Sequence, residues 1–331
     1  MKLDSVREIK ARALDRIVQP MLAARPRALG LAFAAAPIEN TKQATRLFAL
    51  GVSPAGKGNF KLAVRLQRHS LAAHPEIERL SRLAKGEVDI NFIGRVQKRA
   101  VPWYQQQCRP LNVGCSIAHF GVTAGTLGGF VTPRSGGRIQ VLSNNHVLAN
   151  ENNAKKGDAI LQAGPYDGGK AADRVATLAR FVRLRSNNAN LVDSATATVV
   201  DDIDHDPAKL RGLGALKGLA DPEIDEGLKV AKVGRTTGVT RGRVTAFEID
   251  DLVVAYDIGN VGFDGQIEIE GAGTGPFSDG GDSGSLIVDS DGYAVAQLFA
   301  GTDSGGRNNA GLTYATPIHT VLDALRVDLL Y

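Results

Sequence analysis

The feature that most constrains this chain is a long series of short strand-like segments beyond residue 110, separated by glycine-rich or Asp/Asn-containing turns. Glycine permits the backbone angles that tight turns require, and short strands at regular spacing are typical of a sandwich or barrel. The sequence therefore predicts a mainly β domain over residues 111–331. The expected strands are Gly125–Thr132, Ile139–Ser143, Ala176–Val182, Ala195–Val200, Val230–Val233, Gly242–Phe247, Gln266–Ile269, Ser285–Val288 and Ala294–Phe299.

The first 110 residues have a different pattern and predict a small α/β module. Val6, Ile9 and Ala13 recur at near-helical spacing. Pro102 and Pro110 interrupt the pattern that follows the module, which places a linker at about 99–112. The expected elements are a helix over 4–24, a hairpin of Thr45–Val52 and Phe60–Leu66, a helix over Pro75–Leu83 and a strand over Val88–Val96, with the apolar run Ala28–Ala34 left unassigned.

The end of the chain predicts a closing helix. Pro317 stands at its expected start, and one face carries regularly spaced apolar residues. Those residues are Ile318, Val321, Leu322, Leu325 and Leu329.

Charge is unevenly divided between the two parts. Residues 1–110 hold 20 Lys/Arg against 8 Asp/Glu, and residues 111–331 hold 19 against 27. Such asymmetry accompanies either an acidic or nucleic-acid partner or two domains that attract each other. The helix expected over 4–24 lacks interleaved aromatic residues and the module matches no recognition motif. We therefore favour attraction between domains and expect no nucleic-acid partner.

Several features of the sequence indicate a cytoplasmic protein. The first twenty residues carry acids inside an amphipathic pattern, unlike a secretory signal, and no run of 18 apolar residues predicts a membrane span. Cys108 and Cys115 are too few for a disulfide framework. Together with His119 they match no common zinc spacing, so we expect no metal and no other cofactor.

The strongest chemical signal is the run Gly280–Ser285, which reads Gly-Gly-Asp-Ser-Gly-Ser before an apolar strand. A nucleophilic serine needs a tight turn that exposes its hydroxyl, with N–H groups nearby to hold an oxyanion. Gly281 and Ser283 could supply those N–H groups, and Ser283 the hydroxyl. The alternative is an ordinary solvent turn, because all four residue types favour turns.

A serine nucleophile requires a base and an acid that orients the base. Among the six histidines, His146 differs in standing where a strand meets a turn, on a rigid support. Asp193 heads a clear strand between His146 and Ser283, while Asp173 and Asp201 are weaker candidates. The order His, Asp, Ser is more specific than any one of its members.

These residues resemble the chymotrypsin-like serine peptidases over about 220 residues, from near Val113 onward. The matching runs are Ser143–Val147, Val192–Ala195 and Gly281–Gly284. Additional similarity lies in Gly234–Gly238 with Gly242–Val244, which is similar to the opening of the second barrel in bacterial members. The runs Val122–Gly128 and Leu142–Asn150 resemble the intracellular trypsin-like group that includes the plant narrow-leaf proteins, which also carry an α/β module before the protease.

The resemblance implies a double antiparallel β-barrel with the site between the barrels. His146, Asp193 and Ser283 would form the triad, and the N–H groups of Gly281 and Ser283 the oxyanion hole. Asp282 would form an internal ion pair. Because this chain lacks the usual activation cleavage site, another residue must supply the positive partner, and the sequence does not identify it.

The family layout also indicates a substrate pocket and a function. The pocket residues would be Phe277, Ser278, Phe299, Ala300 and Gly301. With no acid at its base, we expect a small or medium apolar residue before the cut. The sequence thus predicts a cytoplasmic, homo-oligomeric serine endopeptidase acting on proteins or peptides, without a membrane partner. The alternative is a protease-fold scaffold that binds without turnover.

Overall fold

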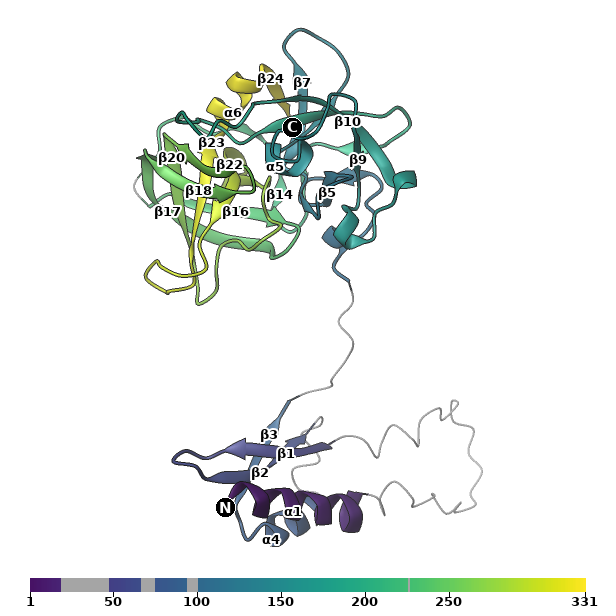
Figure 1. Cartoon of the computed structure of the whole chain (residues 1–331), viewed down its shortest axis with the longest axis vertical. Helices are drawn as coiled ribbons and strands as arrows, with labels where there is room; N and C mark the ends of the chain where they lie inside the picture. Colours follow the sequence, from purple (N-terminus) through teal and green to yellow (C-terminus); the bar gives the residue numbers. More distant parts are fainter. Residues whose placement is uncertain (19–47, 67–74, 94–100, 226) are drawn as a thin grey trace. The chain divides into compact units, whose positions relative to one another are not determined.

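The chain divides into two compact units, Met1–Ala100 and Val101–Tyr331. The computed structural model describes residues 1–18, 48–66, 75–93, 101–225 and 227–331 (Figure 1). The second unit begins inside the stretch 99–112 that the prolines mark as a linker. No helix among the described residues has the length and apolar character needed to cross a membrane.

The first unit is a three-stranded sheet with two helices on one face (Figure 1). The helix α1 contributes Val6, α4 contributes Leu80, and β2 contributes Leu62 and Val64 to one buried apolar cluster. Burying side chains of this kind stabilises a fold by about 1.5–3 kcal/mol each. The elements are α1 (Leu3–Ala13), a π-helical turn η1 (Leu14–Val18), β1 (Phe48–Pro54), β2 (Phe60–Leu66), α4 (Pro75–Leu83) and β3 (Val88–Phe92).

These elements match most of the sequence-based predictions for the first unit. The hairpin forms with Phe48 opposite Leu66, and the second helix spans Pro75–Leu83 as expected. The predicted helix over 4–24 is described as far as Val18. Its remainder and the run Ala28–Ala34 lie outside the described residues.

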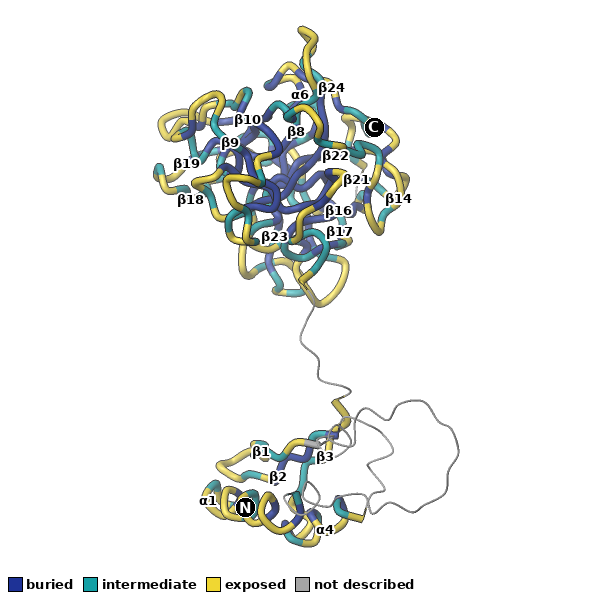
Figure 2. Tube along the Cα trace, turned by 90° about the vertical axis from the view of Figure 1, so that its right-hand side faces the viewer, coloured by how far each residue is buried: buried dark blue, intermediate teal, exposed yellow. Residues whose placement is uncertain are grey.

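The second unit is mainly β, as predicted, and consists of two antiparallel sheets that curve into barrels. Figure 2 shows its buried residues gathered in the interior, with exposed residues in the connecting loops. The first sheet contains β24 (Val327–Leu330), β7 (Gly129–Pro133), β8 (Gln140–Ser143), β11 (Ala195–Val199), β10 (Arg174–Phe181), β9 (Ala159–Leu161), β5 (Ser116–His119) and β6 (Gly125–Thr126) in spatial order.

The second sheet closes into a six-stranded barrel, because β22 pairs with both β21 and β23. Its strands in order are β22 (Tyr293–Gly301), β21 (Leu286–Asp289), β16 (Lys229–Gly234), β17 (Gly238–Ile249), β20 (Gln266–Gly271) and β23 (Leu312–Pro317). A hairpin of β18 (Leu252–Tyr256) and β19 (Gly259–Phe263) forms a separate two-stranded sheet.

The first sheet is less closed than the second within the double-barrel fold that the family resemblance implies. Its terminal strands β24 and β6 do not pair with each other among the described strands, so it is an open half-barrel. The backbone of Thr126 in β6 explains part of this difference, because it bonds elsewhere. Its N–H donates to the carbonyl of Ser283 (2.8 Å) and its carbonyl accepts the Ser143 hydroxyl (2.7 Å).

The predicted closing helix is shorter than expected. The helix α6 spans Ile318–Leu325 and ends where Arg326 adopts a left-handed conformation with φ of 54°. Leu329 lies in β24 and pairs with Val131 of the first sheet. The apolar spacing that suggested one helix therefore comes from a helix followed by a strand.

The remaining elements of the second unit are short and complete its connections. A two-residue strand pairs in parallel with β22, and another such pair joins the beginning of the unit to the loop at His205. These remaining elements are η3 (Trp103–Gln105), β4 (Leu111–Asn112), α5 (Asn145–Leu148), η4 (Pro165–Asp167), η5 (Ala171–Asp173), β12 (His205–Asp206), β13 (Lys209–Leu210), β14 (Gly214–Ala215) and β15 (Gly218–Leu219).

Candidate active site

The pairing of β8 with β11 brings His146 and Asp193 to the same end of the first sheet. Ser143, the last residue of β8, lies opposite Ala195, the first residue of β11. The antiparallel register places His146 just beyond one strand end and Asp193 just before the other. His146 Nδ1 lies 2.5 Å from Asp193 Oδ2, and the His146 N–H donates to Asp193 Oδ1 at 3.2 Å. The side chain of Asn144 holds the Asp193 carbonyl (2.6 Å).

Burial and charge shift the pKa values of both members of this pair. The Asp193 side chain is 0% exposed and that of His146 is 21% exposed. Burial opposes protonation of His146, but the charge and hydrogen bond of Asp193, aided by Glu151, raise its pKa above 6.5. Burial pushes the pKa of Asp193 upward, yet His146 and then Tyr256 more than offset it and lower the pKa below 3.8.

The same contact selects the tautomer of His146. An ionised carboxylate only accepts hydrogen bonds, so the proton of the neutral imidazole lies on Nδ1. The lone pair of Nε2 is then free to accept a proton from another group.

Asp193 has a further partner that the sequence did not suggest. The hydroxyl of Tyr256, at the end of β18, donates to Asp193 Oδ2 at 2.7 Å. The continuous apolar run at residues 252–256, followed by Gly259, could have indicated a hairpin. Nothing in the sequence linked that hairpin to Asp193, which lies 63 residues earlier.

Ser283 lies in a tight turn whose glycines are required. Gly281 has φ of 93° and Gly284 has φ of 95°, angles that side-chain-bearing residues rarely adopt. A Cβ on Gly284 would lie 2.1 Å from Ser143 Oγ and 2.4 Å from the Thr126 carbonyl oxygen. The turn is thus pressed against the start of the segment that carries His146, and only glycine fits at the contact.

The carbonyl groups of Gly280 and Gly281, next to the predicted oxyanion hole, both accept hydrogen bonds. The Thr236 hydroxyl donates to the Gly280 carbonyl (2.6 Å), and the Thr126 hydroxyl donates to the Gly281 carbonyl (2.9 Å). In a trans peptide the N–H points away from the preceding carbonyl. The Gly281 N–H is therefore directed away from Thr236, and within the described residues neither it nor the Ser283 N–H donates a hydrogen bond.

Ser283 and His146 are not joined by a hydrogen bond among the described residues. The serine is tied to the first sheet through its carbonyl, which accepts from Thr126, and through Gly284 against Ser143. The structure thus joins two of the three predicted triad residues directly, and it anchors the third on the segment that leads to His146.

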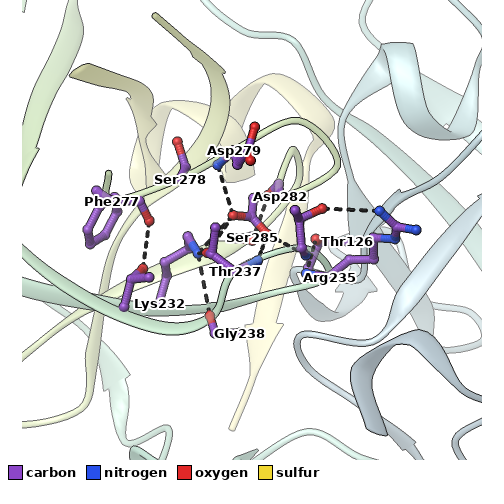
Figure 3. A network of polar contacts seen from close by, with 12 residues as sticks. Thr126, Lys232, Arg235, Thr237, Gly238, Phe277, Ser278, Asp279, Asp282 and Ser285 are labelled. Atoms are coloured by element: carbon purple, nitrogen blue, oxygen red, sulfur yellow. Dashed lines mark hydrogen bonds and ion pairs between the residues drawn. The ribbon is translucent and has the colours of Figure 1, made fainter. Parts of the chain in front are cut away.

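Lys232 supplies the positive partner of Asp282 that the sequence could not identify (Figure 3). Both side chains are 0% exposed, and Lys232 Nζ lies 3.1 Å from Asp282 Oδ2. The Thr237 hydroxyl accepts from Lys232 (2.5 Å) and donates to Asp282 (2.7 Å). Asp282 also accepts the N–H groups of Thr236 (2.7 Å), Thr237 and Asp279.

This network compensates for the cost of burying two charges. Burial lowers the pKa of Lys232, an effect that the charge and hydrogen bond of Asp282 oppose. Because Asp282 immediately precedes Ser283, fixing its carboxylate fixes the base of the nucleophile turn. The expected internal ion pair of Asp282 is present, with a lysine of β16 as the partner.

The predicted pocket residues separate into two groups. Phe277 is 1% exposed and its ring centroid lies 5.7 Å from Lys232 Nζ, while Phe299 is 3% exposed and packs against Phe263 with the rings tilted. Both phenylalanine side chains are therefore buried. Ser278 and Ala300 are partly exposed and Gly301 is exposed.

Ser278 and Gly301 lie next to each other. The Ser278 hydroxyl bonds to that of Thr313 at 2.6 Å, and a Cβ on Gly301 would lie 3.5 Å from it. The described residues contain no cluster of three or more His, Cys, Asp or Glu side chains that could hold a metal ion.

The structure is similar to solved structures of serine proteases. Thermobifida fusca protease A is 18% identical, with a TM-score of 0.46, covering 66% of this chain and 97% of its own. Nocardiopsis protease is 16% identical, with a TM-score of 0.47, covering 67% and 100%. Cellulomonas bogoriensis chymotrypsin is 18% identical, with a TM-score of 0.44, covering 66% and 99%. No protein-family model and no curated protein matches the sequence.

Proposed function

We propose that the chain is a serine endopeptidase that hydrolyses peptide bonds through Ser283, His146 and Asp193. The observation that carries the proposal is the buried His146–Asp193 pair, whose geometry leaves Nε2 of the imidazole free to accept a proton. The glycine-constrained turn at Ser283, anchored on the same end of the first sheet, supports it. An isolated surface serine would need neither feature.

In the first half of the proposed reaction, the Ser283 hydroxyl attacks the carbonyl carbon of the scissile peptide bond. His146 Nε2 takes the hydroxyl proton, and the buried Asp193 carboxylate stabilises the imidazolium that forms. The N–H groups of Gly281 and Ser283 donate to the oxyanion. His146 then returns the proton to the leaving amine as the C–N bond breaks, which leaves an acyl-enzyme.

In the second half, water replaces the amine. His146 takes a proton from the attacking water, and the ester bond to Ser283 breaks as that proton returns to the serine oxygen. The Lys232–Asp282 pair takes no proton in this cycle. Its role is to hold the backbone at Asp282, so that the following residue keeps its place.

A second function, binding without turnover, is favoured by one observation. The described hydrogen bonds include none between Ser283 and His146, as would hold for a chain that keeps the fold in a latent or silent arrangement. Catalytic hydrogen bonds are often long in proteins without substrate, and we therefore place the endopeptidase first.

Reaction with a fluorophosphonate probe tests the proposal. We expect the native chain to be labelled covalently and Ser283→Ala to be unlabelled, because the probe reacts with an activated serine hydroxyl. Ser285→Ala is the matched control, since that serine lies in the same turn but uses its hydroxyl to bond the Asp282 carbonyl. Absence of labelling of the folded native chain would favour the binding protein instead.

The finer assignments are proposals of the same kind. We propose that residues 111–331 form the protease domain and residues 1–110 a regulatory or oligomerisation module. The likeness of two sequence runs to the narrow-leaf group supports a cytoplasmic, homo-oligomeric protein. The proposed pocket residues are Phe277, Ser278, Phe299, Ala300 and Gly301, and a small or medium apolar side chain is the expected preference.

A further inference from the structure

We propose that Tyr256 is a positioning residue for catalysis, which holds Asp193 and the ring of His146 in their working orientation. This inference rests on the proposed function of the His146–Asp193 pair. It assigns a role to the hairpin β18–β19, which belongs to neither barrel.

The first support is the set of hydrogen bonds to the Asp193 carboxylate. Oδ1 accepts the backbone N–H of His146, and Oδ2 accepts both His146 Nδ1 and the Tyr256 hydroxyl. The side chain has no exposed surface, so water cannot substitute for a missing donor. Tyr256 is the one partner of this carboxylate within the described residues that does not come from His146. Its donor therefore decides where Oδ2 lies relative to the imidazole.

The second support is the contact between the two rings. The rings of Tyr256 and His146 have centroids 5.9 Å apart at an interplanar angle of 64°, an edge-to-face arrangement. Aromatic pairs favour this geometry. Tyr256 thus touches both members of the pair, binding the acid through its hydroxyl and packing against the base through its ring.

The third support is the way the hairpin is attached. Asn190, three residues before Asp193, exchanges backbone hydrogen bonds with Gly262 (2.9 Å) and Asp264 (3.0 Å). The Ile258 N–H donates to the carboxylate of Glu151, five residues after His146, at 3.1 Å. The hairpin is therefore hydrogen-bonded to the segments next to Asp193 and His146, which a role in positioning these two residues requires.

Aromatic packing also holds the hairpin in place. The ring of Tyr256 lies 6.1 Å from that of Phe263, which in turn lies 4.7 Å from Phe299. Phe263 is fully buried. The tyrosine packs against a series of mutually tilted aromatic rings that ends in the second barrel, so its hydroxyl has little freedom to leave Asp193.

Tyr256 also keeps its proton while His146 titrates. Burial, followed by the charge and hydrogen bond of Asp193 and the charge of Glu151, raises the pKa of Tyr256 well above 10. The titratable groups that face it are Asp193, His146 and Glu151. At neutral pH the tyrosine therefore always acts as a donor.

The test compares Tyr256→Phe with the native chain by the second-order rate constant of fluorophosphonate labelling from pH 5 to 9. Loss of one hydrogen bond to a charged group predicts a maximal rate lower by about 10-fold. The remaining donors leave more of the Asp193 charge facing the imidazolium, so the pKa of His146 and the acid midpoint of labelling should both move upward. A purely structural role would lower the melting temperature without moving that midpoint.

Tyr314→Phe is the matched control. Its hydroxyl bonds to Glu268 at 3.2 Å, so its loss should leave both the rate and the midpoint unchanged. If Tyr256→Phe labels at the native rate with the native midpoint, the inference is wrong while the proposed function stands.

A nuclear magnetic resonance titration of His146 separates the inference from the proposed function. It measures the imidazole pKa whether or not Ser283 reacts. If the native chain is not labelled, the proposed function fails, and a higher His146 pKa in Tyr256→Phe still supports the placement of Tyr256. An unchanged pKa in that variant overturns the inference.

Discussion

Asp193 in the half-barrel and Asp282 at the closed barrel have carboxylates with no exposed surface, and each faces a base. Their partners differ. His146 keeps 21% of its side chain exposed and the charge of Asp193 helps to raise its pKa above 6.5, whereas Lys232 is fully buried. Both carboxylates are buried and both accept several hydrogen bonds, so neither property distinguishes the two sites.

The difference teaches how one molecule uses the same pairing for two purposes. In the pair with the proposed catalytic role, the base is a histidine that keeps 21% of its side chain exposed. In the other pair, the base is a lysine whose ammonium group also donates to the Thr237 hydroxyl and the Gly238 carbonyl. The following predictions test that division.

The largest expected effect is on the first pair. In Asp193→Asn an amide N–H can face the imidazole and favour the wrong tautomer, so the labelling rate should fall by about 10⁴-fold. The rate constant of fluorophosphonate labelling measures this change. Asp158→Asn is the control, because Asp158 also pairs with a histidine, His119 at 3.2 Å, away from Ser283. Similar losses in both variants would mean that the first pair has no special role.

The next effect is on the second pair and concerns stability. Lys232→Met leaves the Asp282 carboxylate buried without its cation, and removal of one partner of a buried pair costs about 3–5 kcal/mol. Chemical denaturation should show this loss in the free energy of unfolding. The double variant Lys232→Met with Asp282→Asn should recover part of it. A single variant as stable as the native chain would show that the pair does not hold the fold.

The smallest effect is the pH dependence of the native chain. His146 acts as a base only when neutral, and its pKa is raised above 6.5, so the labelling rate should fall as pH drops through a midpoint above 6.5. The sign for stability is opposite. Because the pKa of His146 is higher in the folded chain, its protonation stabilises the fold at pH values below the unfolded pKa. This stabilisation is lost as pH rises through the folded pKa. A labelling midpoint at or below 6.5 contradicts the first expectation.

The parts of the site that depend on local sequence could be predicted. The turn at Ser283 has a local signature, because only glycine suits Gly281 and Gly284. His146 and Asp193 could be selected because each stands at a strand end, and the structure joins them at 2.5 Å. The mainly β architecture follows from the same glycine-separated strands.

The rest depended on contacts that sequence spacing does not carry. Lys232 reaches Asp282 through the pairing of β16 with β21, and Tyr256 reaches Asp193 through a hairpin that no sequence pattern tied to the site. Phe277, in the loop after β20, and Phe299, in β22, are both buried, and the family layout alone did not predict that burial. Leu329 was placed in a helix because the left-handed turn at Arg326 has no glycine to mark it.

The pairing of β24 with β7 has a consequence for biosynthesis. A ribosome makes β7 nearly two hundred residues before its partner Val327–Leu330. Until then the half-barrel has an unpaired edge, and open strand edges promote association with other chains. The nascent protein therefore passes through a stage in which its later barrel is complete while its earlier one is not.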